Sequence, residues 1–111
     1  MVQATLHHPE REEIELTAVL HALSDPQRLA MVRELAAAEA PIPCGAIDLG
    51  VAKSTMTHHY RVLREAGVIR QARVGAMKLT ELRREDLDAR FPGLLDAVLA
   101  SASLPAQPAK A

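Results

Sequence analysis

The segment from Val51 to Gly67 constrains this chain most, because its side chains separate into two faces at the α-helical period of 100° per residue. One side is an apolar, core-forming stripe made by Met56, His59, Tyr60 and Leu63. The opposite side carries hydroxyls, an imidazole and a guanidinium with one acid, and its members are Ser54, Thr57, His58, Arg61 and Glu65. Such groups reach phosphates and base edges in the major groove of DNA. The pattern predicts an amphipathic helix with a DNA-facing side; a merely solvated polar face is the alternative.

The basic residues gather in the middle of the chain, although the formal net charge is only −1. Residues 1–52 hold three arginines against eight acidic residues, and residues 85–111 hold two basic residues against four acidic ones. Residues 53–84 reverse this balance, with two acids against eight basic residues: Lys53, Arg61, Arg64, Arg70, Arg73, Lys78, Arg83 and Arg84. Because the local field governs phosphate binding more than the total charge does, this block favours a nucleic-acid partner.

The length of 111 residues and the hydrophobic content of 49% fit one globular domain. We expect a flexible N-terminal arm over residues 1–9, a folded domain over residues 10–102, and a disordered tail over residues 103–111. The apolar runs are far shorter than the ~20 residues of a transmembrane helix, and the N-terminus lacks a signal-peptide pattern. The expected location is therefore the cytoplasm. Cys44 is the only cysteine, so no intrachain disulfide can form.

Turn and cap residues divide the first half of the chain into helices. A first helix is expected over residues 10–23, where acids crowd the N-terminal turns. A second is expected over residues 26–39, with Asp25 as its N-cap and Pro26 at its first position. A short third helix is expected over residues 44–49, ahead of the amphipathic helix.

In the second half of the chain, the spacing of apolar residues stops following the helical period after Gly67. Residues 68–73 and 76–82 read as a short antiparallel hairpin that carries basic side chains. A last helical region is expected over residues 84–102, interrupted at Pro92 by a kink or by a division into two helices. The fold class predicted is mainly α with a small β-hairpin. A short helix, a turn, a polar-faced helix and then a basic hairpin is the order of a winged helix-turn-helix.

Two stretches resemble the ArsR family of bacterial winged-helix repressors. ALSDPQRLAMVRELA, at residues 22–36, resembles the family's second helix, and STMTHHYRVLREAGVI, at residues 54–69, resembles its recognition helix. The resemblance covers about residues 12–100. It implies a homodimer that binds a palindromic operator and represses transcription until an inducer releases it.

The resemblance also implies positions for DNA contact. The residues that would face DNA are Lys53, Ser54, Thr55, Thr57, His58 and Arg61. On the hairpin, or wing, Arg73 and Lys78 would contact phosphates. Relatives often place a serine N-cap where this chain has Ala52, so Ser54 is an alternative N-cap that would start the helix two residues later.

The metal sites found in many family members are not intact here. Gly45 and Ile47 stand where the resemblance places the two metal-binding cysteines, and Cys44 lies one position away. The last helix has aspartates but no histidine for the second metal-binding pattern. No metal and no cofactor are therefore expected. A redox role for Cys44 and a metal site involving His7 and His8 are alternatives to a small packed residue and an unliganded arm.

Two further expectations concern packing. His59 lies toward the core stripe, so we expect a structural histidine there, whereas His58 faces outward and is expected to bond to DNA. The first and last helices hold more large apolar side chains than one small domain can cover, which favours a dimer formed through both helices. The predicted dimer residues are Leu16, Leu20, Leu94, Leu95, Val98 and Leu99.

Together these features predict a sequence-specific regulator that binds double-stranded DNA as a homodimeric repressor. No catalytic motif is present, so no enzyme activity is expected. Few aromatic residues are available for stacking, which argues against single-stranded nucleic acid as the partner. The alternatives are a winged-helix module that binds proteins instead of DNA, and a repressor that responds to a metal or oxidant through a non-standard site. The sequence names no inducer.

Overall fold

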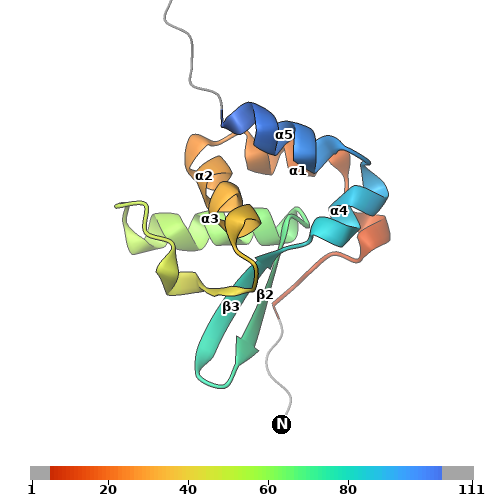
Figure 1. The fold of residues 1–111 in the computed structure, drawn as a ribbon. Coiled ribbons are helices and arrows are strands. Elements are labelled where there is room, and N and C mark those ends of the chain that lie inside the picture. Colours follow the sequence, from red (N-terminus) through yellow and green to blue (C-terminus); the bar gives the residue numbers. More distant parts are fainter. Residues whose placement is uncertain (1–5, 104–111) are drawn as a thin grey trace, which may run out of the picture.

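The computed structural model describes residues 6–103 and shows five α-helices with a small antiparallel sheet (Figure 1). The helices are α1 (Leu16–Leu23), α2 (Pro26–Ala37), α3 (Lys53–Glu65), α4 (Arg84–Arg90) and α5 (Leu94–Ala102). The strands are β1 (Ile42–Pro43), β2 (Ile69–Val74) and β3 (Met77–Leu82), and two 3-10 turns are η1 (Arg11–Glu13) and η2 (Cys44–Ala46). The expected winged helix-turn-helix fold is confirmed.

The first helix is shorter than predicted, because the chain leaves the helical path at Ile14. Glu10 and Glu13 cap η1 reciprocally, and the Glu10 N–H donates to the Glu13 side chain over 2.7 Å. Ile14 then adopts an extended conformation and is fully buried. Helix α1 starts only at Leu16. The single helix expected over residues 10–23 is therefore wrong, since the backbone is extended at both Ile14 and Glu15.

Helix α2 begins as its sequence predicts. The Asp25 carboxylate accepts hydrogen bonds from the backbone N–H groups of Gln27 at 2.9 Å and Arg28 at 3.1 Å, and Pro26 occupies the first helical position. Met31, Val32 and Leu35 are buried on its inner face. This helix packs against α1, α3 and α5.

The third helix expected over residues 44–49 is wrong in extent, because only the 3-10 turn η2 forms there. The Asp48 carboxylate accepts from the Gly50 N–H over 2.8 Å, a local bond that draws the chain into a turn instead of a helix. The preceding residues also add a strand that was not expected. Ile42 and Pro43 of β1 pair with Thr80 and Leu79 of β3, so the sheet has three strands in the order β1-β3-β2.

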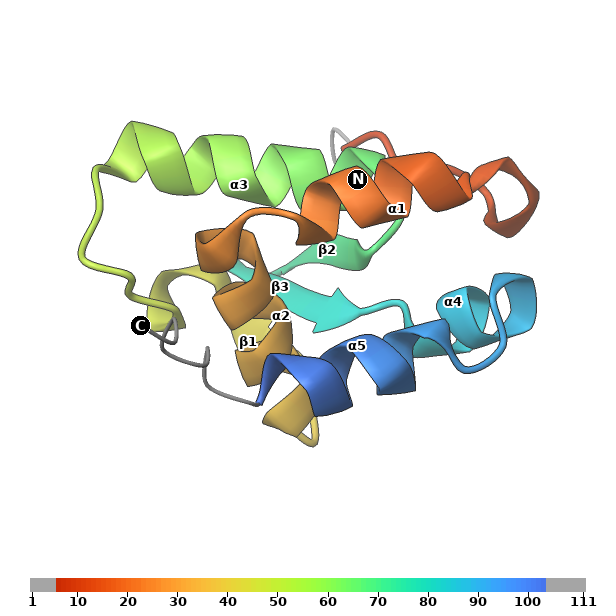
Figure 2. The same cartoon turned by 90° about the horizontal axis from the view of Figure 1, so that it is seen from above.

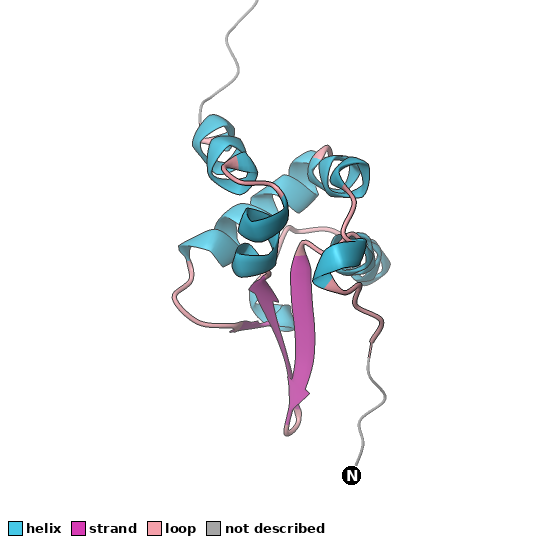
Figure 3. Cartoon of the chain, turned by 90° about the vertical axis from the view of Figure 1, so that its right-hand side faces the viewer, coloured by secondary structure: helices cyan, strands magenta, loops and turns pink. Residues whose placement is uncertain are grey.

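The hairpin formed by β2 and β3 lies where the sequence predicts it, but its turn lies one residue later than the expected Val74 and Gly75. The two strands pair from Ile69–Leu82 to Val74–Met77, which leaves a two-residue turn at Gly75 and Ala76. Gly75 has a positive φ of 62°, which a two-residue hairpin turn needs at its first central position. Seen from the side, the hairpin leaves the helices as a narrow two-stranded ribbon (Figure 3).

The last helical region divides at Pro92 and Gly93 into α4 and α5, as the sequence indicates. Seen from above, α3 and α1 run side by side along one edge of the domain, and α5 lies along the opposite edge (Figure 2). Helices α1 and α5 also lie on the side away from the hairpin tip (Figure 1). No helix among the described residues combines the length and apolar character needed to cross a bilayer.

The described part of the predicted arm, residues 6–9, packs on the domain instead of extending from it. The Gln71 backbone N–H on the edge strand β2 donates to His8 Nε2 over 3.0 Å, and His8 Nδ1 lies 2.9 Å from the Leu6 carbonyl. Pro9 is buried, and its carbonyl accepts from Arg83 over 2.7 Å. Residues 1–5 of the arm and residues 104–111 of the tail lie outside the described residues.

Candidate nucleic-acid interface

Helix α3 presents the two faces that its sequence predicts. His59, Tyr60 and Leu63 are buried against the domain. The side chains exposed on the outer face are Lys53, Ser54, Thr57, His58, Arg61 and Glu65. Thr55 lies at the border between the two faces and is half-buried. The outer face thus keeps the polar side chains that the sequence assigned to it exposed, and the Thr57 hydroxyl donates to the Lys53 carbonyl over 3.0 Å.

The N-terminus of α3 has no side-chain cap. Ala52 is the N-cap residue, so the alternative start at Ser54 is wrong. The Ala52 carbonyl accepts the first helical bond from the Met56 N–H over 3.1 Å. Because alanine offers no acceptor, the N–H groups of the first turn remain free to donate to an anion, and the positive end of the helix dipole lies beside Lys53.

The inner face of the hairpin changes character from its base to its tip. Cross-strand partners lie on the same face, and the pairs on this face are Ile69–Leu82, Gln71–Thr80 and Arg73–Lys78. From the base of the hairpin to its tip, these pairs therefore change from apolar, through neutral polar, to cationic. Arg73 and Lys78 are both exposed and lie directly opposite each other. Like charges in such positions repel, and an anion bound between them would relieve that repulsion.

Four of the eight cations in the central basic block are exposed and make no side-chain bond within the described part of the chain. Within residues 6–103, these are Lys53, Arg61, Arg73 and Lys78, whose side chains form neither an ion pair within 4.0 Å nor a hydrogen bond to the domain.

The other four cations of the block bond within the domain. Arg70 faces Glu81 at 3.7 Å and Asp86 at 3.4 Å. Arg83 is buried and pairs with Asp86 at 2.9 Å. Arg64 donates to Gln71, and Arg84 donates to the Ala36 carbonyl. Counting the basic residues in the sequence therefore overestimates how many are free to contact DNA, because the sequence alone does not show these bonding partners.

His59 joins the recognition helix to α2, which confirms its expected structural role. Its Nδ1 lies 3.3 Å from an Arg28 guanidinium nitrogen, and its Nε2 lies 2.7 Å from Gln27 Oε1. Arginine can only donate, so Nδ1 must be the acceptor and Nε2 must carry the proton. Arg28 itself is buried and donates to the Ala22 and His21 carbonyls. The motif Asp25-Pro26-Gln27-Arg28 thus both starts α2 and holds α3 in place.

We expect this contact to make stability depend on pH. Burial lowers the pKa of His59, and the nearby Arg28 charge acts in the same direction, although Asp25 opposes it. The unfolded chain therefore takes up a proton first, and the free energy of unfolding falls as pH drops below the ordinary histidine pKa of about 6.5. In urea unfolding experiments, the free energy of unfolding should fall more between about pH 7.5 and 5 for the wild type than for His59→Gln.

His8 has to be separated from this effect because burial lowers its pKa as well. Comparing the wild type with His59→Gln, and then repeating the pair in a His8→Gln background, isolates the contribution of His59. Equal pH dependence of His59→Gln and its parent in both backgrounds would contradict the role given to the Arg28 contact.

Comparison with known proteins supports the same fold and function. Residues 23–72 match a family model described as a helix-turn-helix domain. An uncharacterized HTH-type transcriptional regulator, YceK of Bacillus subtilis, is 30% identical over 82 residues, which are 72% of this chain and 82% of that protein. The chain belongs to the ArsR family of winged helix-turn-helix transcriptional regulators.

Solved structures of ArsR-type proteins agree with this assignment. The transcriptional repressor BigR from Xylella fastidiosa is 25% identical with a TM-score of 0.61, over 89% of this chain and 100% of that chain. An ArsR family transcriptional regulator is 23% identical with a TM-score of 0.60, over 86% of this chain and 100% of that chain. This ArsR-family chain is therefore a DNA-binding transcriptional regulator.

Cys44, one position from where the resemblance places the metal-binding cysteines, contacts the hairpin here. The Cys44 thiol lies 2.8 Å from Thr80 Oγ1 and accepts from Gln71 Nε2 at 3.3 Å. Within residues 6–103, no three side chains of the His, Cys, Asp or Glu types come together as a metal site would require. Both ring nitrogens of His8 already contact backbone groups.

The residues predicted to form a dimer interface divide into two groups. Leu16 and Leu20 are 43% and 44% exposed on α1, and Leu94, Val98 and Leu99 are half-buried on α5. Leu95 is only 2% exposed, because it points into the protomer's own core. Leu95 is therefore wrong as an interface residue, whereas the other five leave apolar surface open to a partner.

Proposed function

We propose that this ArsR-family regulator is a homodimeric repressor that binds a palindromic operator in double-stranded DNA. The observation that carries the proposal is the position of the four exposed, unpaired cations. Lys53 and Arg61 lie on the outer face of α3, and Arg73 and Lys78 lie on the inner face of the hairpin. Helix α3 enters the major groove, where Ser54, Thr57, His58 and Arg61 contact base edges or adjacent phosphates.

The hairpin and the start of α3 hold the DNA backbone on either side of this contact. Arg73 and Lys78 bind phosphates from the wing, and Lys53 binds another beside the uncapped helix N-terminus. Phosphate contacts fix the protein on the duplex without reading sequence. Specificity therefore depends on the four outward residues of α3 rather than on the wing.

The open apolar surface supports the homodimer. Leu16 and Leu20 are exposed one helical turn apart on α1, and this helix lies on the side of the domain away from the hairpin tip (Figure 1). Two copies joined through α1 and α5 leave both recognition helices free. A two-fold dimer matches a palindromic site whose halves lie about one DNA turn apart, ~34 Å.

The direct test is binding of the purified protein to a fluorescent duplex from the region upstream of its own gene, with a scrambled duplex as control. We expect a preference of roughly 10³-fold or more for the upstream duplex and a steep decrease of affinity with salt. Weak and equal binding to that duplex, to the scrambled one and to genomic fragments would contradict the proposal and favour a protein-binding module.

Two substitutions separate base reading from phosphate anchoring. Arg61→Ala should weaken operator binding by about 1–3 kcal/mol while leaving non-specific binding nearly unchanged. Lys78→Ala should weaken operator and non-specific DNA alike and lower the salt slope by about one unit per half-site. Fluorescence anisotropy at several salt concentrations measures both effects. Unchanged operator affinity in Arg61→Ala removes this residue from the site, and a loss confined to the operator in Lys78→Ala contradicts the wing assignment.

A further inference from the structure

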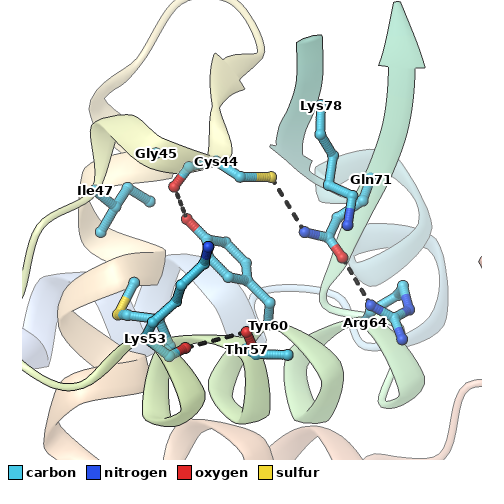
Figure 4. A pocket seen from close by; sticks show the side chains of 10 residues that line it. Cys44, Gly45, Ile47, Lys53, Thr57, Tyr60, Arg64, Gln71 and Lys78 are labelled. Carbon is cyan, nitrogen blue, oxygen red and sulfur yellow. Dashed lines mark hydrogen bonds between the residues drawn. The ribbon is translucent and has the colours of Figure 1, made fainter. Parts of the chain in front are cut away.

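A cavity of about 360 Å³ lies between the recognition helix and the hairpin (Figure 4). This volume is within the range of small-molecule sites in proteins. Its floor is a stripe of α3 at spacings of four, three and four residues, formed by Lys53, Thr57, Tyr60 and Arg64. Its other walls come from η2, the chain that follows it, and the two long strands. The cavity is thus bounded by the same two elements that the proposed function places on DNA.

The charge of the cavity wall is entirely positive. Lys53, Arg64 and Lys78 line it, and no Asp or Glu does. Arg64 donates from Nη1 to Gln71 Oε1 over 2.8 Å, and this bond holds the guanidinium and the amide together. Its Nε is buried without an acceptor among the described residues. Because three cations and no carboxylate line the cavity, it favours a ligand that brings a negative charge.

The cavity also has an apolar part. Ile47 lies across the cavity from the side chains of Gln71, Arg64 and Lys78 (Figure 4). Met56 and the Tyr60 ring complete this part. The Tyr60 hydroxyl donates to the Cys44 carbonyl over 2.6 Å, and burial raises the Tyr60 pKa to about 12, so the phenol stays neutral. The ring therefore offers apolar surface rather than a negative charge.

We propose that this cavity binds a small organic anion, with its carboxylate or phosphate group at Arg64, Gln71 and Lys78 and its apolar body against Ile47 and Tyr60. Lys53, Thr57 and Lys78 both line the cavity and belong to the proposed DNA contacts. Resting on the proposed function, the anion would compete with DNA and release the operator.

Direct binding is tested first, without DNA, by calorimetry with four probes. Phenyl phosphate and benzoate pair an anionic group with a ring, benzamide keeps the ring without the charge, and acetate keeps the charge without the ring. We expect saturable binding of at least one ring-bearing anion, and at least about tenfold weaker binding of benzamide and acetate, as expected for losing a charge-assisted bond or the apolar burial. No saturable binding of either ring-bearing anion, or equally tight binding of benzamide, overturns the proposal.

Variants then locate the site. Arg64→Met should lower the affinity for the probe by about tenfold or more. Lys78→Met should also lower this affinity, and Lys78 is exposed, so its replacement does not disturb the core. Arg73→Met is the matched control, because Arg73 lies on the same face of the hairpin but does not line the cavity. Affinity for the probe equal to wild type in both Arg64→Met and Lys78→Met, or an equal loss in Arg73→Met, overturns the assignment to this cavity.

The effect of the anion on operator affinity is measured separately, at constant ionic strength. Saturating probe should weaken operator binding by the wild type, and the effect should be lost in Arg64→Met, which alters no proposed DNA contact. Probe binding with unchanged operator affinity overturns the competition but not the site. If the protein binds no DNA at all, the proposed function fails, while the calorimetry without DNA still decides whether the cavity binds the anion.

Discussion

A Leu16→Glu/Leu20→Glu double variant is expected to remain folded, to become monomeric, and to bind its operator at least about 100-fold more weakly than the wild type. Both leucines are more than two-fifths exposed in the single chain, so the protomer's own core does not depend on them. In the proposed dimer the same positions are covered by the partner, where a carboxylate without a counter-charge is strongly unfavourable. A monomer holds only one recognition helix and loses the second half-site.

Sedimentation velocity measures the oligomeric state, circular dichroism the fold, and fluorescence anisotropy the operator affinity of this variant. Thr17→Glu is the control, because Thr17 is also exposed on α1 and its replacement adds one carboxylate between the two leucines, against two in the double variant. The control should remain dimeric or weaken the dimer much less. A double variant that sediments like the wild type would place the interface elsewhere, and a wild type that is monomeric at micromolar concentration would contradict the dimer itself.

The sequence predicted the outer face of α3 well because helical periodicity determines which residues share a side. His58 and His59 show this most clearly: adjacent in the chain, one is exposed and the other buried. The same periodicity places Thr57 and Arg61 on the exposed side, where both are found. The hairpin itself was predicted because Gly75 marks its turn, but its register was not: the expected turn at Val74 and Gly75 lies one residue early, and the observed turn places Arg73 opposite Lys78.

What could not be predicted depends on contacts between distant parts of the chain. Asp86 bonds to Arg11, Arg70 and Arg83, and this removes cations from the interface that a charge count includes. The burial of Leu95 likewise follows from how α5 lies on the domain rather than from its apolar pattern. The cavity beside α3 arises only when the hairpin folds back across the helix, so no local motif could reveal it.

The junction between α3 and β2 is the point where such a distant contact sets the geometry of the interface. Gly67 follows α3 with a φ of +86°. Its N–H donates to the Arg64 carbonyl and the Val68 N–H donates to the Leu63 carbonyl, both over 3.0 Å, which is the hydrogen-bond pattern of a Schellman motif. Ile14, which breaks the predicted first helix, packs directly on this glycine. The sequence indicated a helix end at Gly67 but not the side chain that covers it.

Gly67→Ala is therefore expected to lower the free energy of unfolding by about 2–4 kcal/mol, combining a left-handed conformation that costs roughly 1–2 kcal/mol with overpacking of similar size. A β-carbon at this position would lie 2.6 Å from Ile14 Cγ1 and 2.9 Å from Cδ1, distances that force the chain or the side chain to move. Because the same junction orients the hairpin relative to α3, we expect operator affinity to fall as well. Urea unfolding and anisotropy measure the two effects.

Gly93→Ala is the matched control, because Gly93 has nearly the same φ of +83° but open space where a β-carbon would be. It should show only the conformational cost, about 1–2 kcal/mol. In an Ile14→Ala background, which removes the atoms that clash, the cost of Gly67→Ala should fall toward that of Gly93→Ala. An equal cost of Gly67→Ala in both backgrounds would mean that Ile14 does not constrain the junction. The position of the wing relative to the recognition helix would then depend on the β2–β3 pairing and the Arg64–Gln71 bond instead.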